Sequence, residues 1–205
     1  MTMYIFYYTV NTPYEKEAAE LAASLDQFGL RYKSYPVRSK GNWLDNVCLK
    51  SGIILQAWND FKEPLVYLDA DARVVQKPKL FDSLTCDLGV HIRKQEGFSF
   101  FCSTMYWGRT ETSHKLLLDW DTRCHRQEKV IPRELPPPYY KVHTLDWAIA
   151  DQGPLVNAYL SFKDQGINVD LFNLPKAYAV KSKSLHKERI IVQTQKSIEY
   201  RKLIR

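Results

Sequence analysis

The sequence is poor in cysteine and glycine and contains no long apolar run. Its 205 residues include four cysteines and eight glycines. The cysteines lie far apart without C-x-x-C spacing, which argues against a zinc site or a disulfide framework and favours small buried hydrophobes or spare thiols. No stretch approaches the roughly 20 apolar residues of a spanning helix, and the first residues lack the basic start of a signal peptide. We therefore expect a cytoplasmic protein without a transmembrane segment.

The composition is that of a folded chain with a basic excess. Hydrophobic residues make up 45% and aromatic residues 13% of the sequence, which is enough for a full core and argues against disorder. We expect one domain over residues 1–205. The net charge of +6 favours anionic partners, and both nucleotide phosphates and nucleic acid qualify. Much of this charge lies in a basic C-terminal segment, residues 181–205, which we interpret as a solvated tail rather than a nucleic-acid surface.

The first part of the chain has the pattern of a β-α-β unit. Residues 4–10 are rich in β-branched and aromatic residues, and Asn11-Thr12-Pro13 interrupts them, which predicts a buried strand followed by a turn. Apolar residues then recur at a spacing near 3.6 over residues 14–28, which predicts a helix. Residues 32–37 alternate weakly and predict a second strand. Together these elements predict an α/β fold with a mostly parallel sheet.

The same kinds of pattern place further elements along the chain. Prolines at four positions within residues 130–143 mark a loop, because proline fits neither a helix interior nor a central strand. This loop is expected to be either a mobile lid or a plain surface excursion. Helices are predicted over residues 44–61, 114–127 and 145–160, and strands over residues 64–68, 86–92 and 98–107. A late strand is predicted within residues 169–178 and is expected to end at Pro175.

Two acidic residues follow a short apolar strand. Residues 64–68 read Pro-Leu-Val-Tyr-Leu and lead directly into Asp69-Ala70-Asp71. Open α/β sheets bind ligands at the carboxyl ends of their strands, and Asp69 and Asp71, two residues apart, can converge on one ion there. Carboxylate oxygens are ligands that Mg²⁺ and Mn²⁺ prefer. A surface turn is the alternative, but the preceding strand favours a divalent cation site.

The segment PLVYLDADARVVQKPKLFD resembles the D-x-D region of small GT-A-fold glycosyltransferases in the nucleotide-diphospho-sugar transferase group. In such enzymes the acidic pair holds a divalent ion that bridges the diphosphate of a nucleotide sugar. Further segments are similar to this family in the expected order, over roughly residues 4 to 200. They are Gly41-Asn42-Trp43-Leu44-Asp45-Asn46 with Lys50, the aromatic strand at residues 100–107, and Asp151-Gln152-Gly153-Pro154-Leu155. The resemblance implies a Rossmann-like α/β/α sandwich with a mostly parallel central sheet.

The resemblance also implies a donor site at the ends of the first strands. Tyr8, Thr9 and Asn11 would contact the base and ribose of the nucleotide. Tyr8 would stack on the base, although core packing explains this residue almost as well. Arg38 and Lys50 would neutralise the diphosphate, and the alternative is that they are solvated surface cations.

On the sugar side, the resemblance implies that Asp151 accepts hydrogen bonds from sugar hydroxyls and that Gln152 lies near the anomeric carbon. Taken alone, these two residues would only mark the N-terminus of a helix. Ser103 is a further candidate for donor binding. It follows Cys102 where related enzymes often have Ser-Gly, and this difference changes how closely the backbone can approach the donor.

The expected cofactor is Mn²⁺ or Mg²⁺ held by Asp69 and Asp71. The family often supplies a histidine near the C-terminus as a further ligand, and Gln193 occupies that position here. Gln193 is therefore a candidate ligand, but an amide oxygen binds Mn²⁺ more weakly than imidazole does, so the third ligand stays open. His186 is flanked by lysine and is expected to be solvated.

These observations predict a metal-dependent glycosyltransferase with a UDP-linked donor. No carboxylate is placed as a general base, and the resemblance favours retention of the anomeric configuration. The acceptor is expected to be a saccharide or a hydroxymethylated base in DNA, which the positive charge would favour. Two other classes stay open. A nucleotidyltransferase is less favoured because no glycine-rich phosphate loop follows the first strand, and a non-catalytic nucleotide-binding protein would keep the fold without turnover.

Overall fold

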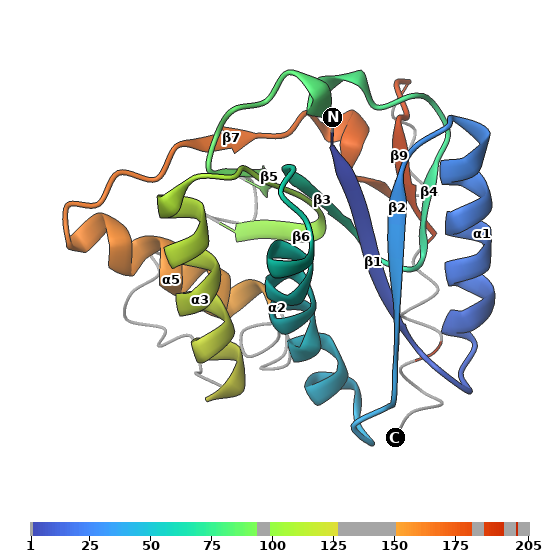
Figure 1. Cartoon of the computed structure of the whole chain (residues 1–205), viewed down its shortest axis with the longest axis horizontal. Coiled ribbons are helices and arrows are strands. Elements are labelled where there is room, and N and C mark those ends of the chain that lie inside the picture. The colour runs from blue at the N-terminus through green and yellow to red at the C-terminus, as the bar shows by residue number, and fades with distance from the viewer. Residues whose placement is uncertain (1, 94–98, 127–150, 182–186, 195–199, 201–205) are drawn as a thin grey trace.

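A six-stranded sheet forms the centre of the computed structural model, which describes residues 2–93, 99–126, 151–181, 187–194 and 200 (Figure 1). The strands lie in the order β2-β1-β3-β6-β5-β7. Their bounds are Met3–Thr9 (β1), Tyr32–Val37 (β2), Leu65–Leu68 (β3), Leu88–Arg93 (β5), Ser99–Trp107 (β6) and Leu171–Asn173 (β7). The described α-helices are Tyr14–Gln27 (α1), Trp43–Asp60 (α2), Glu111–His125 (α3) and Gln152–Asp164 (α5).

One strand of this sheet runs against the others. Strand β1 is parallel to β2 and β3, and β5 is parallel to β7, whereas β6 is antiparallel to both β3 and β5. The mostly parallel sheet that the sequence predicts is therefore confirmed. Because β6 runs in reverse, its amino-terminal half lies at the same edge of the sheet as the carboxyl ends of β1 and β3.

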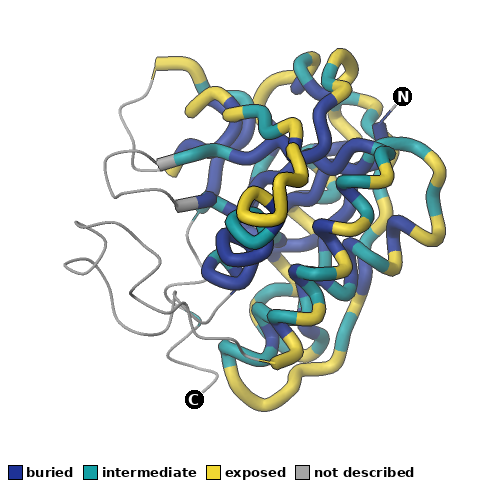
Figure 2. Tube along the Cα trace, turned by 90° about the vertical axis from the view of Figure 1, so that its left-hand side faces the viewer, coloured by how far each residue is buried: buried dark blue, intermediate teal, exposed yellow. Residues whose placement is uncertain are grey.

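Helices cover both faces of the sheet. Side chains alternate along β1, so that Met3 and Ile5 join the core under α2, α3 and α5, while Tyr4 and Phe6 join the core under α1. Figure 1 shows α1 on one side of the sheet and the other three helices on the opposite side. In Figure 2 the buried positions run along the strands and the inner sides of the helices. The α/β/α sandwich implied by the resemblance is confirmed.

Local signals explain where the helices begin and end. The Asn42 side chain accepts a hydrogen bond from Asp45 N at 2.9 Å, which caps the N-terminus of α2. Gly29 follows α1 with a φ of 63°, a conformation that favours glycine at a helix end. The prediction for α3 begins too late. The Thr110 side chain caps Ser113 N, and the helix therefore starts at Glu111 rather than at residue 114.

A second, three-stranded sheet lies beside α1 and is not predicted by the sequence (Figure 1). Its strands, Ala72–Val74 (β4), Val180–Lys181 (β8) and Ile191–Gln193 (β9), lie in the order β4-β9-β8. Strand β9 is antiparallel to β4 and parallel to β8. Because β4 begins directly after Asp71, this small sheet holds the backbone on the C-terminal side of the acidic pair.

The strand predicted within residues 169–178, with its end at Pro175, is shorter in the structure than expected. Strand β7 ends at Asn173, and Pro175 precedes a short 3₁₀ helix at Lys176–Tyr178 (η4). Proline cannot donate to a strand ladder, which accounts for the early end. Another 3₁₀ helix spans Lys79–Asp82 (η1).

Some predictions fall wholly or partly outside the described residues. The helix predicted over residues 145–160 is present from Gln152 and continues beyond the predicted end to Asp164, whereas its first residues are not described. The proline-rich loop at residues 130–143 and most of the basic segment also lie outside the described ranges. Within those ranges, no helix is long and apolar enough to cross a membrane.

Candidate functional site

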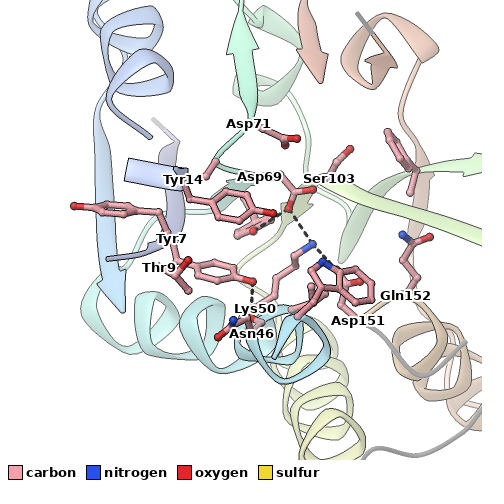
Figure 3. Close-up of a pocket in the computed structure, with 16 residues that line it drawn as sticks. Tyr7, Thr9, Tyr14, Asn46, Lys50, Asp69, Asp71, Ser103, Asp151 and Gln152 are labelled. Atoms are coloured by element: carbon pink, nitrogen blue, oxygen red, sulfur yellow. Dashed lines mark hydrogen bonds and ion pairs between the residues drawn. The ribbon is translucent and has the colours of Figure 1, made fainter. Parts of the chain in front are cut away.

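A pocket opens at the edge of the sheet where β1 and β3 end (Figure 3). Open α/β sheets bind their ligands at this edge. Strand β1, the start of α1, helix α2, the turn after β3, strand β6 and the start of α5 all contribute to the lining. The lining residues are Tyr7, Tyr8, Thr9, Tyr14, Trp43, Asn46, Val47, Lys50, Tyr67, Asp69, Ala70, Asp71, Phe101, Ser103, Asp151 and Gln152.

Backbone hydrogen bonds hold the acidic turn, residues 69–72, from several sides. Asp69 N donates to Ser103 O of β6 at 2.9 Å, and Ala72 N donates back to Asp69 O at 2.9 Å. Thr194 N, just after β9, donates to Asp71 O at 2.9 Å. Asp71 is buried, whereas the Asp69 side chain is 32% exposed toward the pocket. The two carboxylates therefore sit on a fixed backbone rather than on a free surface turn.

Lys50 of α2 joins two carboxylates beneath the pocket. Its buried ammonium lies 3.0 Å from Asp69 Oδ1, forms an ion pair with Asp151 Oδ2, and donates to Cys102 O at 3.2 Å. These three acceptors match the three N–H donors of a lysine. Burial alone would lower the pKa of Lys50, but Asp151 and Asp69 together raise it well above its ordinary value. Lys50 is therefore a permanent cation that holds both carboxylates in place.

Asp151 lies immediately before α5 but does not cap this helix with its side chain. Its carboxylate turns instead to Lys50, while Trp120 Nε1 of α3 donates to its backbone oxygen at 2.8 Å. The residue is buried, and burial raises the pKa of Asp151 although Lys50 opposes the shift. A helix-capping role alone does not account for this placement.

Five further lining residues with polar side-chain groups are not predicted from the sequence as site residues: Tyr7, Tyr14, Trp43, Asn46 and Tyr67. Tyr67 donates from its hydroxyl to Asp69 Oδ1 at 3.0 Å. Tyr7 donates from its hydroxyl to Asn46 O at 2.8 Å (Figure 3). Burial raises the pKa of both phenols above the ordinary value, so they act as hydrogen-bond donors. The strand period carries a signal for Tyr67, because residues two apart on a strand share a face and Tyr67 precedes Asp69 by two. Asn46 offers no comparable signal.

Gln193 of β9 lies behind the pocket lining. Its Nε2 donates to Ser103 O at 3.4 Å and to Thr104 Oγ1 at 3.3 Å. Its Oε1 is buried and has no hydrogen-bond partner in the described part of the chain. A buried amide oxygen without a donor is suited to bind a cation. The described residues hold no group of three or more His, Cys, Asp or Glu side chains placed for a metal.

The structure brings together most of the site residues suggested by the sequence. The three exceptions are Asn11, Arg38 and Gln193, none of which belongs to the lining. Asn11 is exposed and left-handed at φ 60°, and its N–H donates to Glu15 Oε1 at 2.9 Å. Arg38 is exposed just after β2. The suggested residues that do line the pocket are Tyr8, Thr9, Lys50, Asp69, Asp71, Ser103, Asp151 and Gln152.

Comparison with solved structures identifies the fold class. The chain superposes with a TM-score of 0.64 and 12% identity on a glycosyltransferase involved in the glycosylation of the major capsid of PBCV-1, with 99% of this chain and 98% of that chain covered. The glycosyltransferase GlyE of Streptococcus pneumoniae TIGR4 gives a TM-score of 0.56 at 13% identity. The fold is therefore a glycosyltransferase fold, as the D-x-D resemblance implied.

The two structures differ in how much of each is matched. The chain spans nearly the whole of the PBCV-1 capsid glycosyltransferase, but only 55% of GlyE, while 94% of this chain is covered. No protein-family model matches the sequence, and no curated protein matches it either. At these identities the likeness establishes the fold, and the chemistry has to be argued from the pocket.

Proposed function

We propose that this chain is a metal-dependent glycosyltransferase that moves a sugar from a nucleotide-diphosphate donor to a hydroxyl acceptor. The observation that carries this proposal is the convergence of Asp69, Asp71, Asp151 and Lys50 in one pocket, at the ligand-binding edge of a glycosyltransferase fold. Three carboxylates and one ammonium leave two negative charges in excess among these lining residues. A divalent cation would neutralise that excess.

Asp71 and Asp69 would hold the ion, with the buried Oε1 of Gln193 as the candidate third ligand. The free hydrogen-bonding capacity of this oxygen supports the assignment. Mn²⁺ and Mg²⁺ both accept carboxylate and amide oxygens. When bound, such an ion supplies Lewis acidity that stabilises negative charge on the departing nucleoside diphosphate.

The remaining polar residues would bind and orient the donor. Tyr8 and Thr9 at the end of β1 would contact the base and ribose of a uridine nucleotide, which their position in the pocket lining supports. Asp151 and Gln152, at the start of α5 and also in the lining, would contact the hydroxyls and the anomeric carbon of the sugar. Lys50 holds Asp151 and Asp69 at fixed positions, so the two carboxylates need no rearrangement when substrate enters.

A retaining reaction fits the chemistry of this lining best. An inverting enzyme needs a general base that activates the acceptor on the face opposite the leaving group. The described lining carboxylates are already engaged, since Asp151 and Asp69 contact Lys50 and Asp71 belongs to the proposed ion site. We propose transfer with retention of the anomeric configuration on this ground.

The proposed acceptor is a saccharide rather than a base in DNA. Lys50 is the single cation among the described lining residues, and its donors are used by Asp69, Asp151 and Cys102 O. The divalent cation would serve the diphosphate of the donor, so no cation among these lining residues would be left to meet the phosphates of a polyanionic acceptor. A neutral saccharide needs no such cation.

Acceptor competition gives the first test. With a UDP-sugar and Mn²⁺, simple saccharides should accept sugar, while duplex DNA containing hydroxymethylated bases should not. Product would be followed by mass spectrometry at about 50 mM and about 200 mM salt, the range over which phosphate contacts lose most affinity. Transfer to DNA that collapses across this range would contradict the saccharide assignment.

Ligand-dependent stability gives the second test. UDP at 100 times its Kd should add about 2.7 kcal/mol of apparent stability, and the shift should need Mn²⁺ or Mg²⁺. Differential scanning fluorimetry with UDP, UDP-glucose, UDP-galactose and ATP, each with and without metal, would measure it. A shift by ATP alone would favour the nucleotidyltransferase alternative. Binding of a UDP-sugar without any release of UDP would favour a non-catalytic nucleotide-binding protein.

A further inference from the structure

Arg73 lies just behind the acidic turn and carries an unusual number of hydrogen bonds for a residue outside the pocket. It is the middle residue of β4, which packs alongside α1 (Figure 1). Its Nη1 donates to Ala72 O at 2.7 Å and to Glu17 O at 3.2 Å, and reaches Ala70 O at 3.5 Å. Its Nη2 donates to Glu17 Oε2 at 2.6 Å and also pairs with the Glu20 carboxylate.

The guanidinium completes the hydrogen bonding of the turn backbone. The four carbonyl oxygens of residues 69–72 each accept a hydrogen bond. Ala72 N serves Asp69 O, and Thr194 N serves Asp71 O. The other two carbonyls, those of Ala70 and Ala72, are served by Arg73. One side chain therefore contacts two of the four carbonyl oxygens of the turn.

The charge of Arg73 is balanced on the side away from the pocket. A guanidinium beside the acidic turn would repel a divalent cation if it were unpaired. Glu17 is buried and Glu20 is half-exposed, and both face the guanidinium from α1. The hydroxyl of Tyr200 donates to the other oxygen of Glu17 at 3.0 Å, which holds that carboxylate in place. Arg73 can thus hydrogen-bond to the turn while Glu17 and Glu20 neutralise its positive charge.

We propose that Arg73 is a positioning residue, which fixes the backbone of the acidic turn against α1 and so places the carboxylates of Asp69 and Asp71. Its effect on metal affinity rests on the function proposed above, but its effect on the turn does not. Arginine is required because one planar fork reaches the carbonyls and both carboxylates at once, whereas lysine offers a single point of attachment.

Two readouts test the role of Arg73. Without metal, Arg73→Met should speed hydrogen–deuterium exchange in the peptide spanning residues 69–75 by about tenfold or more, and Arg73→Lys by less, because the turn loses its anchored carbonyls. With metal, the Kd for Mn²⁺, measured by electron paramagnetic resonance of the free ion, should weaken by about tenfold in Arg73→Met, as is common for residues that orient metal ligands.

Arg31→Met is the matched control. Arg31 forms an exposed ion pair with Glu63 at 2.9 Å, and its backbone oxygen pairs with Tyr4 N at the opposite end of β1. Arg31→Met should change neither the hydrogen–deuterium exchange of residues 69–75 nor the Kd for Mn²⁺. Unchanged exchange in folded Arg73→Met, or in Arg73→Lys if the first variant does not fold, overturns the positioning role whatever the metal does. Wild-type protein that binds no Mn²⁺ overturns the proposed metal site, and the exchange result then decides the role of Arg73 by itself.

Discussion

Replacement of Asp71 by asparagine is expected to lower metal-dependent release of UDP from a UDP-sugar by about a thousandfold. Asp71 is buried in the acidic turn and would supply a full negative charge to the ion. Asparagine keeps the shape of the side chain but removes that charge. Metal stabilisation of the leaving group is worth several kcal/mol, and about 4 kcal/mol corresponds to about three decades in rate. UDP release coupled to a colour reaction would measure the loss across Mn²⁺ concentrations.

Asp26→Asn is the control for this experiment. Asp26 is an exposed aspartate near the end of α1 that accepts a hydrogen bond from the Tyr32 hydroxyl at 3.3 Å. It lies outside the pocket lining, so its replacement should leave turnover unchanged. Both variants should melt as cooperatively as the wild-type protein. Equal turnover by folded Asp71→Asn and wild type would refute the assignment of Asp71 to the metal.

Replacement of Lys50 by methionine is expected to cost about 3–5 kcal/mol of folding stability near neutral pH and to abolish turnover. The side chains of Lys50 and Asp151 are each only 5% exposed, so the variant leaves a buried carboxylate without its counter-charge. Urea unfolding would measure the loss. Lys115→Met is the matched control, because Lys115 pairs with Glu111 on the surface of α3, and solvent screens such exposed pairs so that they contribute little to stability.

The loss in Lys50→Met should depend on pH. In the wild-type protein burial raises the pKa of Asp151, Lys50 lowers it and Asp69 raises it, so removing Lys50 raises this pKa further. A carboxyl with a raised pKa binds its proton more tightly in the folded state than in the unfolded state. Its ionised form therefore lowers the free energy of unfolding only above the unfolded-state pKa, and most strongly above the raised pKa. The stability difference between the variant and the wild-type protein should therefore shrink as the pH falls.

Two further measurements complete the test of Lys50: stability at alkaline pH, and the stability of a double variant. From neutral pH up to its ordinary pKa of 10.5 the contribution of Lys50 is fully present, and it is lost only as the pH rises through its higher folded pKa. Lys50→Met/Asp151→Asn removes both charges and should recover part of the stability without recovering turnover. If Lys50→Met were as stable as Lys115→Met at pH 7, the buried ion pair would not be a structural element of the pocket.

The large elements of the fold are predictable because they carry local signals. Strand β2 and helices α1 and α2 are bounded within about one residue of the structure, since turns and caps such as Asn11-Thr12-Pro13, Gly29 and Asn42 mark their ends. The small sheet carries no such signal. Its strands are two or three residues long, and β4 pairs with β9 from far along the chain, so that neither periodicity nor propensity reveals them.

The candidate site also has a part that the sequence predicts and a part that it does not. Asp69, Asp71 and Asp151 follow from motifs, and the pocket does contain them. The partnership of Lys50 with two carboxylates does not follow from any spacing in the sequence, because α2, β3 and α5 meet only in three dimensions. The sequence analysis expects Lys50 to serve a diphosphate or the solvent, and its burial excludes the second of these. The first stays a prediction.

The strand order of the small sheet sets a sequence of events during folding. Strand β9 sits between β4 and β8, so β4 gains its ladder partner only when residues 191–193 dock. Contacts between β1, β2 and α1 close short loops and can form early, whereas this pairing closes a loop that contains most of the chain. In a chain that folds while it is synthesised, the backbone pairing beside Asp71 can therefore form only after residues 191–193 have been made. Most of the central sheet can be built before this pairing is in place.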